Sequence, residues 1–198
     1  MERLGLTGSI GMGKSTTAAM LRHLRVPVFD ADAVVHELTG PGGAAVPAIA
    51  AIFPSAVRDG AVDRQVLGGI VFADRAALRR LEGVLHPLVG RARGRFLRRH
   101  RRARRRSVVF DVPLLFETGG EKRCDRVFVV SAPFFLQRQR VLARPGMSVE
   151  KFRAILAKQT PDHEKRRRAD IVLPTGLGRA YTFRCLRRAL RKRKRHGP

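Results

Sequence analysis

The chain has 198 residues, a length that fits one domain or one domain with a small inserted subdomain. Its 41 lysines and arginines against 16 aspartates and glutamates give a formal net charge of +25, but 44% of the residues are hydrophobic, which excludes a disordered chain. No apolar run approaches the roughly 18 residues of a membrane span, no secretory signal is visible, and Cys124 and Cys185 form no CxxC pair. We therefore expect a cytoplasmic enzyme or binding protein without a membrane segment, a disulfide framework or a zinc site.

Much of the positive charge lies in two arginine-rich blocks, at residues 98–106 and 187–195. Such runs can neutralise the phosphates of a nucleic acid. They can equally be a solvated helix end and a solvated tail, and no aromatic residue is interleaved with either block to stack on bases. Nucleic acid is thus a conceivable partner that the sequence does not favour.

Short apolar runs alternate with helical segments along the chain. Strands are predicted at 3–7, 26–30, 107–111, 126–130 and 171–173. Helices are predicted at 14–23, at 134–142, from a cap at Ser148 to Gln159, and in the basic stretch that closes the chain. Strands that are separated by helices indicate an α/β fold with a parallel sheet covered on both faces.

The stretch between the second and third strands is too long for a single crossover helix. We predict helical structure from 46 to about 97, because apolar residues recur there at intervals of three and four. These residues are Leu78, Leu81, Leu85 and Leu88. Pro87 lies inside that run, so a kink or a break is expected there. The stretch should form a small helical subdomain inserted into the sheet domain.

The first predicted strand leads directly into a phosphate-binding motif. GSIGMGKS, residues 8–15, satisfies GxxxxGK[ST], and Thr16 follows it at the start of a predicted helix. Glycines let backbone N–H groups turn inward, and the helix N-terminus adds its positive end. Lys14 should reach the β and γ phosphates, and the Ser15 hydroxyl should bind Mg²⁺. The expected nucleoside triphosphate site comprises Gly8, Gly11, Met12, Gly13, Lys14, Ser15 and Thr16.

Two carboxylates follow the second predicted strand. Asp30 and Asp32 lie at its carboxyl end, the edge of an open parallel sheet where ligands bind. If the strand continues, alternation places both side chains on the same side, toward the phosphates. Either carboxylate could accept the proton of an acceptor hydroxyl or hold the metal. A single Asp at this place could instead cap a helix or form a turn.

At this point the sequence resembles the dephospho-CoA kinase family over nearly its whole length. GLTGSIGMGKST is similar to that family's nucleotide loop and FDAD to its second-strand motif. VDRQVL, IVF and LHP occur in the order of the family's acceptor-binding insert. DVPLLFE resembles the third-strand segment, QRQRVLAR the beginning of the lid, and RADIVL the run before the adenine-contacting turn. Several motifs in the right order are far more specific than the phosphate loop alone.

The resemblance implies a three-layer α/β/α P-loop kinase with a central parallel sheet, a helical acceptor-binding insert and a helical lid. The nucleotide-binding core would comprise 1–32 and 107–198, with the lid at about 137–160. The insert would comprise about 33–106. All of it would form one kinase domain.

The implied reaction is the transfer of a phosphoryl group from ATP to the 3′-hydroxyl of the ribose of dephospho-CoA, giving CoA and ADP, the last step of coenzyme A biosynthesis. Asp32 is the implied base and a candidate metal ligand, and Lys14 and Mg²⁺ would offset the charge on the transferring group. Arg140, and also Arg144, would close over the phosphates and keep water out. Both arginines could equally be ordinary helix-surface charges.

Other residues have weaker assignments. Arg64 and His86, with Asp30, are candidate acceptor-binding residues. Arg64 could instead pair with Asp63 or Asp74, and His86 could cap a kinked helix. Asp111 ends an apolar strand like a carboxylate that holds Mg²⁺.

One segment departs from the family pattern. An asparagine-containing turn commonly follows the last strand in the family, but Pro174, Thr175 and Gly176 stand here. Side-chain contacts to adenine at this turn are therefore not predicted.

Two rival functions remain open at this stage. One is another small-molecule P-loop kinase of the nucleoside monophosphate type. The other is a nucleic-acid-dependent P-loop ATPase, which the net charge would suit. The basic tail contains no motif, so cutting the chain after Leu186 is expected to spare catalysis.

Overall fold

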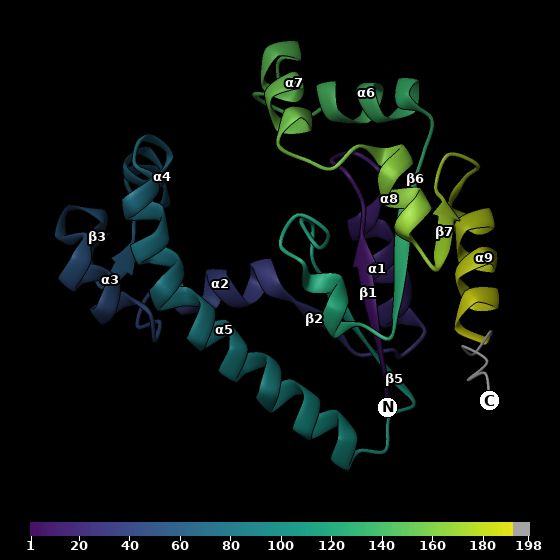
Figure 1. The fold of residues 1–198 in the computed structure, drawn as a ribbon, viewed down its shortest axis with the longest axis horizontal. Coiled ribbons are helices and arrows are strands. Elements are labelled where there is room, and N and C mark those ends of the chain that lie inside the picture. The colour runs from purple at the N-terminus through teal and green to yellow at the C-terminus, as the bar shows by residue number, and fades with distance from the viewer. Residues whose placement is uncertain (192–198) are drawn as a thin grey trace. The chain divides into compact units, whose positions relative to one another are not determined.

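A computed structural model of the protein describes residues 1–191. The chain divides into two compact units (Figure 1). The first comprises residues 1–29 together with the chain from 104 onward, and the second comprises residues 30–103. Among the described residues, no helix combines the length and the hydrophobicity that a membrane crossing requires.

A five-stranded parallel sheet is the centre of the first unit, as the sequence predicts. The strands, in the spatial order β2-β5-β1-β6-β7, are β2 (Val28–Asp30), β5 (Ser107–Asp111), β1 (Glu2–Thr7), β6 (Arg126–Ser131) and β7 (Ile171–Pro174). The central pairing fixes the register, with Leu6 of β1 opposite Asp111 of β5 and Phe128 of β6. The carboxyl ends of β1 and β5 therefore lie side by side.

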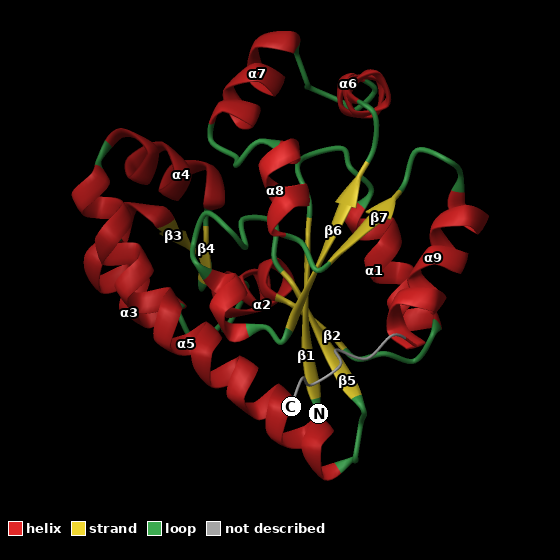
Figure 2. Cartoon of the chain, turned by 45° about the vertical axis from the view of Figure 1, so that its right-hand side comes forward, coloured by secondary structure: helices red, strands yellow, loops and turns green. Residues whose placement is uncertain are grey.

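Helices and loops cover both faces of this sheet (Figure 2). Helices α1 (Lys14–His23) and α9 (Arg179–Arg191) pack on one face, over a core that includes Leu4, Leu6 and Phe128. Residues of opposite parity, such as Val127 and Val129, face a second core under the segment after β5 and near α8 (Asp162–Arg168). This alternation is what a pleated strand buried on both sides requires.

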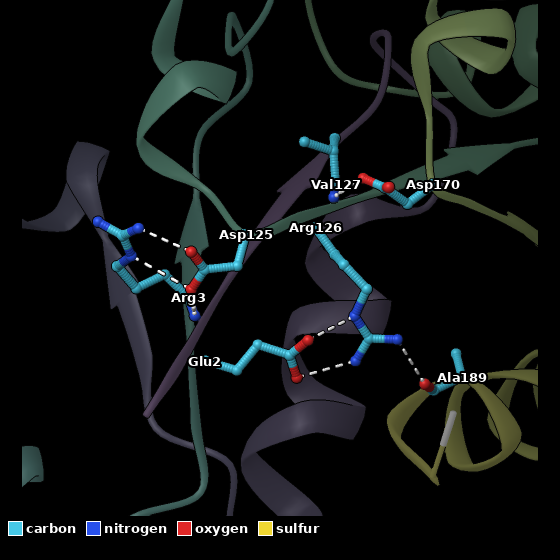
Figure 3. A network of polar contacts seen from close by, with 7 residues as sticks. All are labelled: Glu2, Arg3, Asp125, Arg126, Val127, Asp170 and Ala189. Carbon is cyan, nitrogen blue, oxygen red and sulfur yellow. Dashed lines mark hydrogen bonds and ion pairs between the residues drawn. The ribbon is translucent and has the colours of Figure 1, made fainter. Parts of the chain in front are cut away.

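Ion pairs close the end of the sheet where β1 and β6 begin (Figure 3). Arg126, whose side chain is 5% exposed, forms a bidentate pair with Glu2 and donates to the Ala189 carbonyl in the last turn of α9. Arg3 pairs with Asp125 at 2.7 Å. Arginine is suited to such bonds because its planar guanidinium can serve a carboxylate and a carbonyl at once. The network connects α9 to β1 and β6.

Two further helices follow β6 in the first unit. Helix α6 (Phe134–Leu142) has the predicted bounds. Helix α7 (Val149–Ala157) begins, as predicted, at a cap in which the Ser148 hydroxyl accepts the Lys151 N–H at 3.2 Å, but it ends two residues before Gln159. The sequence did not predict α8 or the short 3-10 helix Gly120–Arg123.

The second unit is mostly helical and has its own core. Its elements are α2 (Ala31–Thr39), α3 (Val46–Ile52), the 3-10 helix Pro54–Ala56, β3 (Val57–Arg58), β4 (Ala61–Val62), α4 (Arg64–Ala73) and α5 (Arg75–Arg102). The prediction of helical structure from 46 to about 97 is confirmed for α3, α4 and α5 but is wrong for part of the stretch between α3 and α4. A small antiparallel β3–β4 hairpin interrupts it, with Asp59 and Gly60 in the left-handed region at the turn.

Of the kink or break predicted at Pro87, the break is wrong, because the 28-residue helix α5 runs through this proline. Leu81 is buried on this helix, and Leu85 and Leu88 pack partly buried against the same core. Packing on both sides of the proline stabilises the helix although one backbone hydrogen bond is lost. The first basic block begins in the last turn of α5, while residues 192–195 of the second block lie outside the described part of the chain.

Candidate active site

The GSIGMGKS segment forms the turn between β1 and α1, as its motif requires. Gly11 and Gly13 have φ angles of 76° and 88°, in the left-handed region that favours glycine. A Cβ at Gly8 would lie 2.3 Å from a Val130 methyl, so the loop also needs glycine for close packing on β6. In the described structure no side chain caps the start of α1. The first-turn N–H groups are thus available to an anion.

Lys14 and Asp111 form an ion pair beside this loop. Lys14 Nζ lies 2.6 Å from Asp111 Oδ1, and the two side chains are 17% and 4% exposed. Asp111 is the last residue of β5, next to the end of β1, so the sheet brings the predicted metal carboxylate to the predicted phosphate lysine. Ser15 and Thr16, the next two residues of the motif, are exposed.

Helix α6 presents Arg140 to the loop and to the turn after β7. The guanidinium donates to the Thr175 carbonyl at 2.8 Å and lies 3.5 Å from the Gly11 carbonyl. Thr175 Oγ1 donates to the Met12 carbonyl at 2.7 Å. The Pro174–Thr175–Gly176 turn, a departure from the family pattern, is therefore bonded directly to the phosphate loop. Arg144, by contrast, is exposed just beyond the end of α6.

Asp30 and Asp32 do not lie on one face of a strand. The alternation expected if the strand continued does not apply, because β2 ends at Asp30 and α2 begins at Ala31. Asp30 is the N-cap of α2, and its carboxylate accepts the Ala33 N–H at 3.0 Å. Asp32 is exposed in the first turn of the same helix. Both residues belong to the second unit.

Arg64 and His86 also belong to the second unit, and both are exposed. Arg64 begins α4 and lies 3.5 Å from the Thr39 hydroxyl. Asp63 and Asp74, the alternative partners of Arg64, instead accept backbone N–H groups at the starts of α4 and α5. His86 lies in the middle of α5 and caps no helix end.

Sequence reasoning missed an ion pair between a buried lysine and a partly buried glutamate. Lys165 of α8 is 0% exposed and lies 2.9 Å from Glu117 Oε1, which also accepts the Thr160 N–H at 2.7 Å. Burial raises the pKa of Glu117, but the bonds from Lys165 and from backbone N–H groups outweigh it, and the net pKa lies below its ordinary value. A basic residue in a short, arginine-rich helix gave no signal that it would be buried.

Two glutamines that sequence reasoning did not assign also contact the loop. Gln137 Nε2 donates to the Ile10 carbonyl at 2.8 Å, and Gln159 Oε1 accepts the Ile10 N–H at 3.0 Å. The available signal was the position of Gln137, a polar residue four places before Val141 on the buried side of α6.

No group of three His, Cys, Asp or Glu side chains within residues 1–191 could hold a metal ion. A metal ion at this site would therefore need oxygen ligands from a bound phosphate in addition to those from the protein. Mg²⁺ is commonly bound in this way, through one or two protein oxygens plus the phosphates of a substrate.

Comparison with known proteins finds relatives over most of the chain. A sequence model of the dephospho-CoA kinase family matches residues 3–177. The dephospho-CoA kinase of Paramagnetospirillum magneticum is 67% identical over 84% of this chain and 78% of its own length. That of Novosphingobium aromaticivorans is 59% identical over 90% and 88% of the two chains.

Solved structures give the same result for the fold. The crystal structure of TT1252 from Thermus thermophilus superposes with a TM-score of 0.82 at 37% identity, over 96% of this chain and 95% of the other. A dephospho-CoA kinase from Campylobacter jejuni has a TM-score of 0.65 at 22% identity, over 96% and 95%, and supports the fold alone. Since the family match spans most of the residues and its relatives are more than half identical to them, this chain belongs to the dephospho-CoA kinase family and is a kinase.

Proposed function

We propose that this kinase transfers the γ-phosphoryl group of ATP to the 3′-hydroxyl of the ribose of dephospho-CoA, giving CoA and ADP. The observation that carries the proposal is the Lys14–Asp111 pair beside an uncapped phosphate loop, in a chain of this family. The reaction would be the last step of coenzyme A biosynthesis, and a cytoplasmic location is part of the proposal. The +25 charge of the chain would attract both polyanionic substrates.

The triphosphate would lie against the loop between β1 and α1. Backbone N–H groups and the exposed first turn of α1 would bind the phosphates, and Lys14 would leave Asp111 to reach the β and γ phosphates. Residues assigned to ATP are Gly8, Gly11, Met12, Gly13, Lys14, Ser15 and Thr16.

The oxygen atoms beside the loop suit Mg²⁺. The Ser15 hydroxyl and the buried Asp111 carboxylate are hard oxygen ligands, and they are separated in sequence but adjoin the same phosphate site. We assign Ser15 and Asp111 to the ion, and consider Asp32 a further candidate ligand. When bound, Mg²⁺ would neutralise charge on the phosphate oxygens.

Asp32 would orient the acceptor hydroxyl and take its proton. The oxygen of that hydroxyl then forms a bond to the γ-phosphorus while the bond from phosphorus to the β–γ bridging oxygen breaks, and ADP leaves with that electron pair. Lys14 and Arg140 would stabilise the charge on the transferring group. The assignment of Asp32 is supported by the resemblance of FDAD to the family's second-strand motif and by the exposure of its side chain.

The second unit would supply the acceptor site. Asp30, Arg64 and His86 are assigned to it. Arg64 and His86 lie in segments similar to the family's acceptor-binding insert and are exposed, while Asp30 belongs to the FDAD segment. The helices α6 and α7 would form the lid, with Arg144 near its base. A lid matters chemically because water in the site would compete with the acceptor for the phosphoryl group.

The decisive experiment measures ADP release by the whole chain with and without dephospho-CoA, and identifies the product by mass spectrometry. We expect ADP formation to depend on dephospho-CoA and the product to carry one added phosphoryl group. Lys14→Ala should abolish transfer, while Asp32→Asn should lower kcat far more than ATP affinity. Turnover that is stimulated by RNA or by a nucleoside monophosphate, and not by dephospho-CoA, would refute the proposal.

A further inference from the structure

The Ile10 peptide is held by side chains on both of its polar groups. Gln137 donates to its carbonyl at 2.8 Å, and Gln159 accepts its N–H at 3.0 Å. Gln137 lies on α6 and is 3% exposed, and Gln159 lies two residues beyond the end of α7. The two bonds therefore come from the two ends of the α6–α7 segment and meet at one residue of the phosphate loop.

The polarity of these bonds is fixed by the backbone. A peptide N–H can only donate and a carbonyl can only accept. Gln159 must therefore present its amide oxygen and Gln137 its amide nitrogen. A glutamate could replace Gln159 and still accept, but a glutamate at 137 could not donate.

Helix α6 packs directly on the residue that follows Ile10. A Cβ added to Gly11 would lie 2.5 Å from a Val141 methyl and 3.0 Å from the Gln137 carbonyl oxygen. Arg140 lies between them on the same face of the helix, and its guanidinium reaches the Gly11 carbonyl at 3.5 Å. One face of α6 thus contacts the loop through three side chains.

The other bond is held by the buried ion pair described above. Thr160, the neighbour of Gln159, donates its N–H to Glu117 at 2.7 Å, and Glu117 is paired with the fully buried Lys165. This arrangement fixes the backbone next to Gln159, so only the Gln159 side chain has to be ordered for its amide oxygen to meet Ile10.

We propose that Gln137 and Gln159 are positioning residues that set the phosphate loop for ATP. They fix the Ile10 peptide, and through it the orientation of the N–H groups from Gly11 onward. Gly11 makes this necessary, because a residue without a Cβ at a φ of 76° has many other accessible conformations. If the loop holds its N–H groups in the binding orientation only part of the time, its apparent affinity for ATP falls in proportion to the population of that orientation. The inference rests on the ATP site of the proposed function.

Paired substitutions test it in the full chain, with ATP affinity measured by calorimetry in the presence of magnesium. Gln137→Met and Gln159→Met each remove one hydrogen bond at similar side-chain length, and each should weaken ATP binding by about 2- to 10-fold. Glutamate at either position brings the same negative charge to the same peptide. We expect Gln137→Glu to weaken binding several-fold more than Gln159→Glu, because only the latter retains its bond.

Gln139→Glu is the matched control, because Gln139 is exposed on α6 and brings an equal charge to the same helix. It should bind ATP nearly as the natural chain does. The thermal midpoint of every variant is measured as well. A variant that binds ATP weakly at a natural midpoint has lost loop geometry, whereas a lowered midpoint indicates a loss of fold. If the variants at Gln137 do not fold, the comparison of Gln159→Met with Gln159→Glu decides: weaker binding for Met and retained binding for Glu support the proposal.

Equal losses for the two glutamate variants, or natural ATP affinity in both methionine variants, would overturn the inference. The proposed function would survive that result if the natural chain still phosphorylates dephospho-CoA. Conversely, a natural chain that binds ATP but ignores dephospho-CoA would refute the proposed acceptor, while the ATP affinities would still judge the two glutamines.

Discussion

Replacing Glu117 by Gln should destabilise the protein strongly. The change removes the negative charge that lies 2.9 Å from Lys165 but keeps an oxygen that can accept the Thr160 N–H. Lys165 is 0% exposed and cannot turn to water, so its ammonium group would be left buried without a counter-charge. Breaking a buried pair in this way typically costs about 3–5 kcal/mol of unfolding free energy. That is a large part of the roughly 5–15 kcal/mol that stabilises a typical protein.

The double substitution Glu117→Gln/Lys165→Met gives the sharper measurement. Methionine is similar in length to lysine and carries no charge, so it removes the buried ammonium that Glu117→Gln leaves behind. We expect the double variant to regain most of the lost stability. Urea unfolding of the natural chain, the single variants Glu117→Gln and Lys165→Met, and the double variant at about pH 7 gives the coupling energy of the pair as a double-mutant cycle.

The pH dependence of the same variants follows from the lowered pKa of Glu117. A carboxyl whose folded pKa lies below its ordinary value of 4.5 contributes stability that is present above 4.5 and is lost as the pH falls through the folded pKa. The difference between the natural chain and Glu117→Gln should therefore shrink on acidification below 4.5. The reasoning is refuted if Glu117→Gln is as stable as the natural chain, or if the double variant is no more stable than Glu117→Gln.

Three other changes have expected outcomes. Gly11→Ala should weaken ATP binding at least about tenfold in calorimetry, because the new Cβ would lie 2.5 Å from a methyl of α6. The control Gly83→Ala, which adds a Cβ in open space on α5, should instead raise the unfolding free energy by about 0.5–1 kcal/mol. Cutting the chain after Leu186 should lower the thermal midpoint, because it removes the last turn of α9 and the buried Ala189. A cut after Arg191 should spare activity. Asp125→Asn should change stability by no more than about 1 kcal/mol, since the side chains of Arg3 and Asp125 are 44% and 37% exposed. Arg3 lowers the pKa of Asp125, so this difference should vanish as acid titrates the carboxyl, and it should fall in high salt. Equal thermal midpoints for the two truncations would show that the last turn of α9 contributes nothing.

Local signals were sufficient for most helices and strands of the sheet unit. The bounds of α1, α6 and β5 are those predicted, since glycine, capping residues and apolar runs mark their ends within a few residues. The phosphate loop is fixed in the same way, because its glycine spacing is itself the geometric requirement.

The second unit could not be predicted in the same detail. Its β3–β4 hairpin has only two residues in each strand, too few to show a period of two. The continuity of α5 through Pro87 depends on leucines that pack against residues distant in sequence. Such tertiary packing overrides a local propensity without leaving a local mark.

The polar residues around the loop were missed for a related reason. A buried glutamine or lysine is recognisable only by its partner, and the partners here lie far apart in the chain: Gln137 with Ile10, and Lys165 with Glu117. Motif matching found the atoms that would touch a phosphate. It could not find the residues that hold the loop in place, because these residues come from distant parts of the chain that only the folded sheet brings together.

The two aspartates of the FDAD segment have different structural positions. A strand would have placed Asp30 and Asp32 in equivalent positions, but the change to a helix at Ala31 gives them different surroundings. The Asp30 carboxylate accepts the Ala33 N–H and so caps the start of α2. Asp32 stands one residue inside the first turn of that helix, exposed. A base must have a carboxylate that is free to accept a substrate proton, and of the two residues the exposed Asp32 meets that requirement better. If Asp32 is the base, as proposed, the cap at Asp30 also fixes the start of the helix that carries it.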